Sequence, residues 1–191
     1  MTGAARPRVT LKLATSLDGR IALANGVSQW ITGPESRAEV HKMRAAHQAI
    51  LTGIGTVLAD DPRMTARPEG GCDRQPDIII MDSQDRTPSG AAVFAETART
   101  VTLVPHRDLA RAMAEYESVM IEAGAQIAAS ALAADLVDRI EWFRAPKLLG
   151  GDGLPVIAAL GLETLDAAPM FRRTGVRERG ADLQESYERI R

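Results

Sequence analysis

Two glycine turns, each leading into a predicted helix, are the stretches of this sequence best suited to chemistry. The first is Leu51-Thr-Gly-Ile-Gly-Thr56, and Asp60 and Asp61 follow it before Pro62. The second is Glu122-Ala-Gly124, which precedes an alanine-rich stretch. A strand that runs into a glycine turn and then a helix leaves backbone N–H groups free for a phosphate or a carboxylate. Taken alone, the first turn is more simply explained as an ordinary strand–helix connection with two solvated acids.

Common phosphate-binding motifs do not account for these turns. Neither turn matches G-x-G-x-x-G, and the chain has no G-x-x-x-x-G-K-[ST], so a Rossmann domain or a P-loop enzyme is disfavoured. The absence of G-x-S-x-G argues against an α/β-hydrolase. The remaining candidates are a strand lysine, two isolated acids and two arginines: Lys12, Asp60, Glu122, Arg44 and Arg67. Carboxylates bind sugar hydroxyls and arginines bind phosphate, so this set suits a phosphorylated, hydroxyl-rich substrate beside a dinucleotide.

Composition narrows the class of protein. A chain of 191 residues predicts a single domain over residues 1–191. Acids and bases nearly cancel at a formal net charge of −2, so we expect neither a nucleic-acid nor a membrane partner. No apolar run is long enough to cross a bilayer, and the first residues do not have the pattern of a signal peptide. The single cysteine, Cys72, fits a cytoplasmic protein and argues against a cysteine-rich zinc site, so no metal is expected.

The elements that would position these residues alternate between strands and helices. Strands are predicted at 9–17, 76–81, 101–104, 118–121 and 138–145, with another ending at 51. Helices are predicted at 34–46, 109–116 and 125–136, with a single helical turn at 56–58. The run Pro76–Met81 is typical of a strand covered on both faces, as in a parallel sheet. A β-hairpin from Met170 to Arg191, with a turn near Gly180, is expected at an edge. The pattern predicts an α/β fold with a mostly parallel central sheet flanked by helices.

Three of the candidate side chains also have an ordinary structural explanation. Lys12 lies opposite the apolar face of the first strand, where a lysine is usually solvated. Arg44 flanks the apolar stripe of the 34–46 helix, where an arginine usually packs its stem and leaves its guanidinium in water. Trp30, by its residue type alone, would be assigned to the core.

Several motifs in a fixed order carry a family resemblance. They are Lys12-Leu-Ala-Thr-Ser-Leu-Asp-Gly19, Ser28-Gln-Trp-Ile-Thr32, the first glycine turn through Pro62, Met81-Asp-Ser83, Glu122-Ala-Gly124 and Ala145-Pro-Lys-Leu-Leu-Gly150. Together they closely resemble the reductase domain of the bacterial riboflavin-biosynthesis deaminase/reductase, over nearly the whole chain from about Val9. The resemblance implies a dihydrofolate-reductase-like fold and a homodimer. It also implies NADPH-dependent reduction of 5-amino-6-(5-phosphoribosylamino)uracil to the ribitylamino compound, by hydride transfer from nicotinamide C4 to ribose C1′.

The resemblance implies a role for each matching residue. The NADPH site would be lined by Ala14, Trp30, Thr56, Asp60, Ser83, Gly124, Ala125, Gln126 and Ile127. The substrate would contact Ser28, Arg44, Met64, Arg67 and Glu122. The catalytic candidates are Lys12, Glu122 and Asp60. Lys12 and Glu122 are suited to hold ribose hydroxyls, and the general acid is left between Asp60 and Glu122, with Glu122 preferred.

The chain departs from the family pattern in three places. It lacks the H-x-E and P-C-x-x-C motifs of the deaminase, so we expect an excised or stand-alone reductase that does not deaminate. The usual Gly-Pro-Thr turn is replaced by Gly124-Ala125-Gln126, which loosens the turn and removes a hydroxyl donor near the cofactor phosphate. The segment between Ser83 and Glu122 is shorter than the matching segment of the family, so part of the wall around the adenosine would be missing.

These departures keep three hypotheses open. The leading one is the pyrimidine-nucleotide reductase described above. The second is a dihydrofolate-reductase-like NADPH oxidoreductase that acts on another substrate. The third is a non-catalytic paralogue that binds a nucleotide or serves as a structural partner, for which the altered turn at Ala125-Gln126 is the main support.

Overall fold

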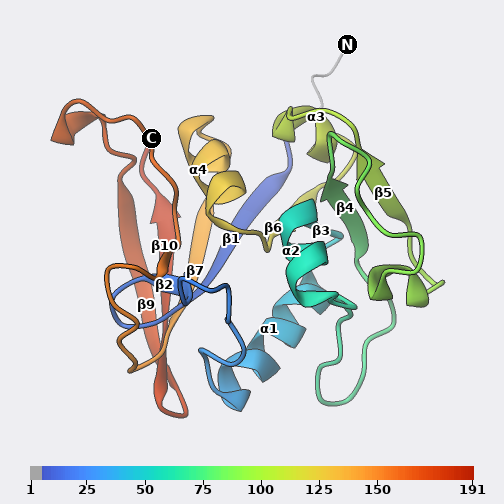
Figure 1. The fold of residues 1–191 in the computed structure, drawn as a ribbon, viewed down its shortest axis with the longest axis horizontal. Helices are drawn as coiled ribbons and strands as arrows, with labels where there is room; N and C mark the ends of the chain where they lie inside the picture. Colours follow the sequence, from blue (N-terminus) through green and yellow to red (C-terminus); the bar gives the residue numbers. More distant parts are fainter. Residues whose placement is uncertain (1–5) are drawn as a thin grey trace.

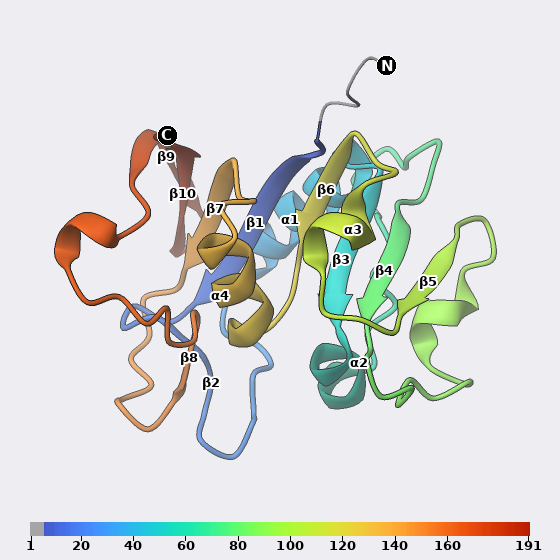
Figure 2. The same cartoon turned by 90° about the horizontal axis from the view of Figure 1, so that it is seen from above.

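The computed structural model describes residues 6–191 and is built around one eight-stranded sheet. The strand order is β5-β4-β3-β6-β1-β7-β10-β9, which runs from right to left in Figure 2. The strands are β1 (Arg8–Thr15), β3 (Ala49–Gly53), β4 (Asp77–Met81), β5 (Val101–Val104), β6 (Ser118–Ile121), β7 (Arg139–Arg144), β9 (Phe171–Arg179) and β10 (Asp182–Arg189). The first six strands in that order pair in parallel, and the β9–β10 hairpin closes one edge antiparallel to β7. The predicted α/β fold, with a mostly parallel sheet and an edge hairpin, is confirmed.

Helices cover both faces of this sheet, which explains the apolar runs of the central strands. In Figure 1, α3 (Leu109–Met113) and α4 (Ala125–Ala133) lie above the sheet and α1 (Pro34–Ala46) lies below it. The short α2 (Ile54–Asp60) packs with α1 against the same face. Side chains of β4 are buried on both faces, as expected for a strand in a doubly covered parallel sheet. No helix within residues 6–191 combines the length and apolar character needed to cross a bilayer.

Several element ends differ from the sequence prediction for local reasons. α2 has seven residues rather than a single turn, and it stops at Asp61, whose φ of 39° is left-handed. α4 ends three residues before the predicted limit because Asp135 takes a φ of 50° and the Leu136 N–H donates to the Ala131 carbonyl. α3 ends at Met113 rather than Tyr116. A small second sheet of β2 (Arg20–Ala22) and β8 (Leu154–Pro155) was not predicted, because β8 has only two residues.

Loops at the carboxyl edge of the sheet are held by two acids. Asp18 accepts hydrogen bonds from the Ser16 hydroxyl at 2.6 Å and from the backbone N–H groups of Leu149 and Gly150, and these bonds lower the pKa of Asp18 to about 2. Asp182, at the start of β10, accepts from the Gly33 N–H at 2.7 Å and from the Ser36 hydroxyl at 2.6 Å. The edge hairpin therefore supplies the polar contact that α1 lacks at its own N-terminus, where Gly33 has no capping side chain.

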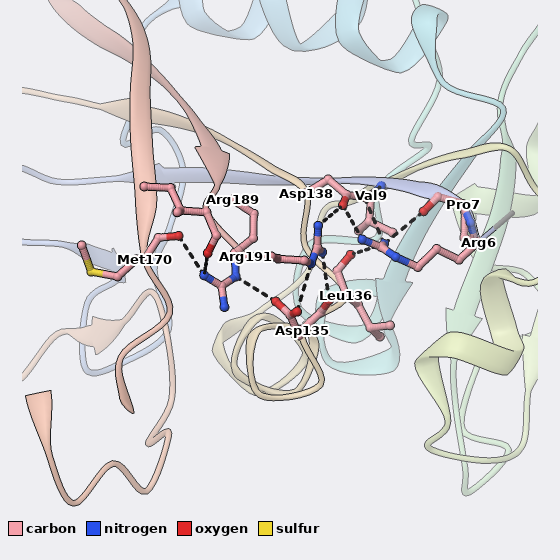
Figure 3. A network of polar contacts seen from close by, with 10 residues as sticks. Arg6, Pro7, Val9, Asp135, Leu136, Asp138, Met170, Arg189 and Arg191 are labelled. Atoms are coloured by element: carbon pink, nitrogen blue, oxygen red, sulfur yellow. Dashed lines mark hydrogen bonds and ion pairs between the residues drawn. The ribbon is translucent and has the colours of Figure 1, made fainter. Parts of the chain in front are cut away.

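An ionic network ties both ends of the described chain to the amino ends of β1 and β7 (Figure 3). Arg6 and Arg191 both donate to Asp138, while Arg189 and Arg191 donate to Asp135. The Val9 N–H also donates to Asp138 at 2.9 Å, which fixes the start of β1. This network stabilises the end of the sheet opposite to the loops that Asp18 and Asp182 hold.

Candidate active site

A nearly buried ion cluster lies beside the carboxyl end of β6. Leu11 in β1 is in register with Ile121, the last residue of β6. The next residues of the two segments, Lys12 and Glu122, therefore lie beside each other. Lys12 Nζ is 3.2 Å from Glu122 Oε1, and Arg44 from the last turn of α1 donates Nη2 to Oε1 at 2.8 Å and Nε to Oε2 at 3.0 Å. These three side chains are only 13–14% exposed. Glu122 is therefore held by a bidentate arginine and a lysine at once.

The charges of this cluster determine the protonation of Glu122. Burial raises the pKa of the Glu122 carboxyl, but the charges and hydrogen bonds of Arg44 and Lys12 outweigh burial and hold that pKa well below its usual range. Glu122 is therefore a carboxylate with no proton to donate at neutral pH. This argues against our preference for Glu122 as the general acid. The cluster also corrects two expectations from the sequence. Glu122 is not an isolated acid, and Lys12 and Arg44 are not solvated cations.

A cleft of about 520 Å³ opens onto this ion cluster. Of the residues predicted for the site, this first cleft is lined by Lys12, Ala14, Ser28, Trp30, Arg44, Thr56, Asp60, Met64, Arg67, Glu122 and Gly124. It therefore contains every predicted substrate and catalytic residue, although they come from β1, α1, α2 and three separate loops.

A second cleft of about 900 Å³ continues along the carboxyl edge of the sheet. Its predicted members are Ser28, Thr56, Asp60, Ser83, Gly124, Ala125, Gln126 and Ile127. Ser28, Thr56, Asp60 and Gly124 line both clefts, so the two share a rim. At that rim the Ser28 hydroxyl lies 3.3 Å from Asp60 Oδ1. A ligand in one cleft can therefore meet a ligand in the other.

Trp30 is not a core residue, contrary to the assignment from residue type alone. Its side chain is 63% exposed on the wall of the first cleft. The Arg37 guanidinium stacks over the indole, 4.5 Å from its centroid, and Lys147 Nζ donates to the Trp30 carbonyl at 2.8 Å. These contacts hold an exposed aromatic ring in place beside the cleft.

Close approach of two glycine turns shapes the second cleft. A Cβ atom on Gly53 would lie 2.6 Å from Ile127 Cδ1, so the absence of a side chain at Gly53 makes room for the Ile127 side chain in the first turn of α4. Gly124 caps α4 without a side-chain hydrogen bond, which leaves the N–H groups of that turn free for another acceptor. The wall of the second cleft therefore fits a diphosphate linker of a dinucleotide.

Two predicted substrate residues contribute in different ways. The Met64 side chain is buried in the core beneath α2, and Arg99 donates to the Met64 carbonyl at 3.0 Å. Met64 borders the first cleft at a point where its backbone takes a left-handed φ of 49°. Arg67 is exposed at the rim and pairs with no acid among residues 6–191. Arg67 is therefore available to an anionic ligand.

Sequence reasoning missed several arginine and histidine residues that line the clefts. In the first cleft His41 donates Nδ1–H to the Thr65 carbonyl at 3.1 Å, and burial, followed by the charge of Arg44, lowers the pKa of His41. Its position three residues before Arg44 on α1 was the available signal, because residues at that spacing share a helix face. The second cleft contains Arg86, His106 and Arg107, which no motif had singled out. Within residues 6–191, no group of three His, Cys, Asp or Glu side chains could hold a metal ion.

Comparisons with known proteins identify the family of this chain. The family model of the RibD C-terminal domain matches residues 7–184. The chain is 39% identical over 215 aligned residues to the riboflavin biosynthesis protein RibD of Escherichia coli, covering 93% of this chain and 58% of that protein. It therefore spans little more than half the length of this relative.

Solved structures give the same result. RibD of Acinetobacter baumannii superposes with a TM-score of 0.89 at 28% identity, covering 97% of this chain and 59% of that one. A Thermotoga maritima protein described as a diaminohydroxyphosphoribosylaminopyrimidine deaminase/5-amino-6-(5-phosphoribosylamino)uracil reductase has a TM-score of 0.83 at 30% identity, covering 97% and 57%. Dihydrofolate reductase of Enterococcus faecalis shares the fold alone, with a TM-score of 0.63 at 15% identity over 96% of this chain and 97% of that one. The chain belongs to the RibD C-terminal domain family.

Proposed function

We propose that this chain reduces the ribosyl group of 5-amino-6-(5-phosphoribosylamino)uracil to the ribitylamino product in riboflavin biosynthesis, with NADPH as the reductant. The observation that carries the proposal is the Lys12–Glu122–Arg44 cluster, which lies in the first cleft beside the rim shared with the second. The description of the Thermotoga maritima relative as a reductase of this substrate supports it. Because the chain spans only part of that protein, no deaminase activity is proposed for it.

The second cleft is the proposed cofactor site. The first-turn N–H groups of α4, at Ala125, Gln126 and Ile127, would hold the diphosphate, while Ser83 would border the adenosine end. Trp30 and Ala14 border the first cleft, where the nicotinamide would extend past the shared rim. When bound, the reduced nicotinamide supplies the hydride that the protein cannot supply itself.

The first cleft is the proposed substrate site. Arg67, exposed and without an acidic partner among the described residues, would bind the substrate phosphate together with Arg44. Glu122 and Ser28 would accept hydrogen bonds from ribose hydroxyls or pyrimidine N–H groups, because an ionised carboxylate can only accept. Holding the ribose in one orientation against the shared rim is the main contribution of these residues to the rate.

Lys12 is the residue we assign as the proton donor. Reduction opens the ribose: the C1′–O4′ bond breaks, C1′ receives a hydride and O4′ receives a proton. Glu122 has no proton to give, whereas Lys12 is an ammonium whose Nζ is fixed 3.2 Å from Glu122 Oε1. Asp60, on the shared rim, is left to orient the ligands through its contact with Ser28.

An assay of NADPH oxidation tests this function. The pure chain is given NADPH, and the phosphoribosylamino substrate is generated in the same vessel by a separate deaminase. We expect the absorbance of reduced nicotinamide to fall only when the substrate is present, with the ribitylamino product formed in equal amount. Binding of NADPH without oxidation would favour a reductase of another substrate. Failure to bind NADPH would favour a non-catalytic paralogue.

We also propose that the chain works in the cytoplasm as a homodimer that pairs through the β9–β10 hairpin. The outer edge of β9 ends the sheet and has no partner strand within residues 6–191. The near-neutral net charge of −2 gives no reason to add nucleic acid or a membrane as partners. Light scattering on the pure protein measures the mass in solution, and a monomer across micromolar concentrations would reject the dimer.

A further inference from the structure

Residues 28–32, which we call the rim segment, border both clefts without belonging to a helix or a strand. The segment lies between β2 and α1. Its Ser28 lines both clefts, and its Trp30 lines the first. Within residues 6–191, the backbone of the rim segment forms no hydrogen bond with another backbone group. Such a segment keeps one position only where side chains from elsewhere hold it.

Two cationic side chains supply the hydrogen bonds that the backbone of the rim segment lacks. Arg37 donates from Nη1 to the Thr32 carbonyl at 2.7 Å, and Lys147 donates from Nζ to the Trp30 carbonyl at 2.8 Å. Among the described residues, no other side chain forms a hydrogen bond with this backbone. Hydrogen bonds from charged donors are stronger than those between neutral groups. The rim segment is therefore held from two elements, α1 and the loop after β7.

Arg37 also holds the side chain of Trp30. Its guanidinium lies over the indole, 4.5 Å from the ring centroid, and so covers one face of the ring. Arg37 is half-buried and forms no ion pair within residues 6–191. Glu39, two residues further along α1, pairs with Lys42 and Arg179 instead. The charge of Arg37 is therefore available to the indole, whose uncovered face is left for the planar ring of a ligand.

The side chains of Arg37 and Lys147 both start from anchored backbone. Arg37 is in the first turn of α1, whose N-terminus is anchored by the buried carboxylate of Asp182. Lys147 belongs to a motif to which sequence reasoning assigned no role. Its N–H donates to the Ala145 carbonyl at 2.8 Å, and its carbonyl accepts from the Leu17 N–H at 2.7 Å. Two fixed points of the fold thus determine where the rim segment lies.

We propose that Arg37 and Lys147 are positioning residues of the first cleft. They hold the rim segment so that the Trp30 indole keeps one face toward the ligands and the Ser28 hydroxyl keeps its place between the two clefts. The inference rests on the proposed function, because it takes this rim to be the place where nicotinamide and ribose meet. Both cations act through Trp30 and Ser28 rather than on the reacting atoms. A displacement of about 1 Å where two reactants must align lowers a rate by up to about 100-fold.

Fluorine NMR of the full chain labelled with 5-fluorotryptophan tests the positioning without relying on the reaction. The chain has two tryptophans, Trp30 and Trp142, and Trp30→Phe identifies the resonance of Trp30. We expect Arg37→Met and Lys147→Met each to move this resonance toward its position in the urea-unfolded chain, because the indole becomes more mobile and more hydrated. The Trp142 resonance should stay in place. Lys42→Met, on the same helix and outside both clefts, is the matched control and should move neither resonance.

A double-mutant cycle on the reductase reaction tests whether Arg37 acts through Trp30. Arg37→Met should lower kcat/KM by about 10-fold in the unchanged chain, but by no more than about threefold in a Trp30→Ala chain, where the ring that it holds is gone. Lys147→Met should lower kcat/KM by about 3- to 10-fold through the lost hydrogen bond. Arg37→Lys keeps the charge without the planar stack, so it should recover part of the loss.

The positioning role is overturned if Arg37→Met costs the same with and without Trp30, or if the Trp30 resonance stays in place in both Arg37→Met and Lys147→Met. A resonance that moves while kcat/KM stays unaltered overturns it as well, because turnover then does not depend on where the rim segment lies. Each of these results leaves the proposed reaction standing when the unchanged chain oxidises NADPH. A resonance that moves in both variants, in a chain that oxidises no NADPH, supports the positioning of the rim segment and rejects the proposed reaction.

Discussion

Lys12 Nζ lies 3.2 Å from Glu122 Oε1, and both side chains are largely withdrawn from water. Arg44 holds the same carboxylate from the side of α1, so one acid fixes two cations that come from different elements. Burying charges is costly unless they are paired and hydrogen-bonded, and each member of this cluster satisfies that condition. The arrangement presents an oriented ammonium group to the first cleft.

Replacing Lys12 should impair turnover far more than binding. Lys12→Met removes the assigned proton donor but keeps the length of the side chain, so we expect kcat to fall by about 100- to 10,000-fold. NADPH affinity should stay within about twofold, because Lys12 lines only the first cleft. Steady-state kinetics and calorimetry measure the two effects.

Lys42→Met is the control for this variant. Lys42 is on α1, where its side chain is 58% exposed and pairs only with Glu39 among the described residues. It should behave as the unchanged enzyme. A Lys12→Met enzyme that keeps its kcat and loses only substrate affinity would remove Lys12 from proton transfer.

Arg44→Ala should weaken the substrate much more than the cofactor. Arg44 borders the first cleft but not the second, and its loss removes a phosphate ligand and the bidentate partner of Glu122. We expect KM for the substrate to rise by about 10- to 100-fold, while the dissociation constant of NADPH changes by less than about threefold. Equal losses for both ligands would show that Arg44 acts on the fold of the whole site instead.

The two glycines of the first turn should respond differently to an added methyl group. In Gly53→Ala the new Cβ meets Ile127 Cδ1, so the end of the Ile127 side chain must shift, and we expect a loss of about 1 kcal/mol in the free energy of unfolding. In Gly55→Ala the Cβ meets nothing within 4 Å and lies inside α2, so stability should be kept or rise by up to about 1 kcal/mol. Urea denaturation compares them, and equal effects would show that β3 and α4 do not depend on this close approach.

Stability should fall as the pH drops from about 7 to about 5. Burial lowers the pKa of His47, and burial with the charge of Arg44 lowers the pKa of His41, below the unfolded value of about 6.5. The unfolded chain therefore binds protons that the folded chain refuses, and the free energy of unfolding rises with pH in this window. In the double variant His41→Gln, His47→Gln this dependence should become shallower. An unchanged slope in urea titrations at several pH values would contradict these shifts.

How far the sequence predicted the structure can be seen from particular elements. Strong local signals placed β5 and β6 to the residue and β4 to within one residue, because an apolar run between turn residues leaves little choice of bounds. Helix ends were less predictable, since α4 is closed by the left-handed Asp135, a conformation that residue type does not announce. β8 forms only by pairing with β2, which no local pattern encodes.

The candidate site shows the same limit. The ordered motifs predicted which residues would gather, and all of them line the two clefts. They could not predict that Glu122 would hold Lys12 and Arg44 together, because that contact joins residues 78 and 110 positions apart in the chain. The basic side chains at Arg86 and His106 were missed because their shared cleft arises only from the parallel pairing of β4 with β5.

The most direct test of the central claim is to follow the transferred hydrogen. NADPH labelled with deuterium at the transferring position of nicotinamide C4 is incubated with the enzyme and the phosphoribosylamino substrate, and the product is analysed by mass spectrometry and proton NMR. If the two clefts seat the cofactor and the ribose against each other at their shared rim, one deuterium should be found on C1′ of the ribityl chain. A product without deuterium, or with deuterium at another carbon, would contradict the account.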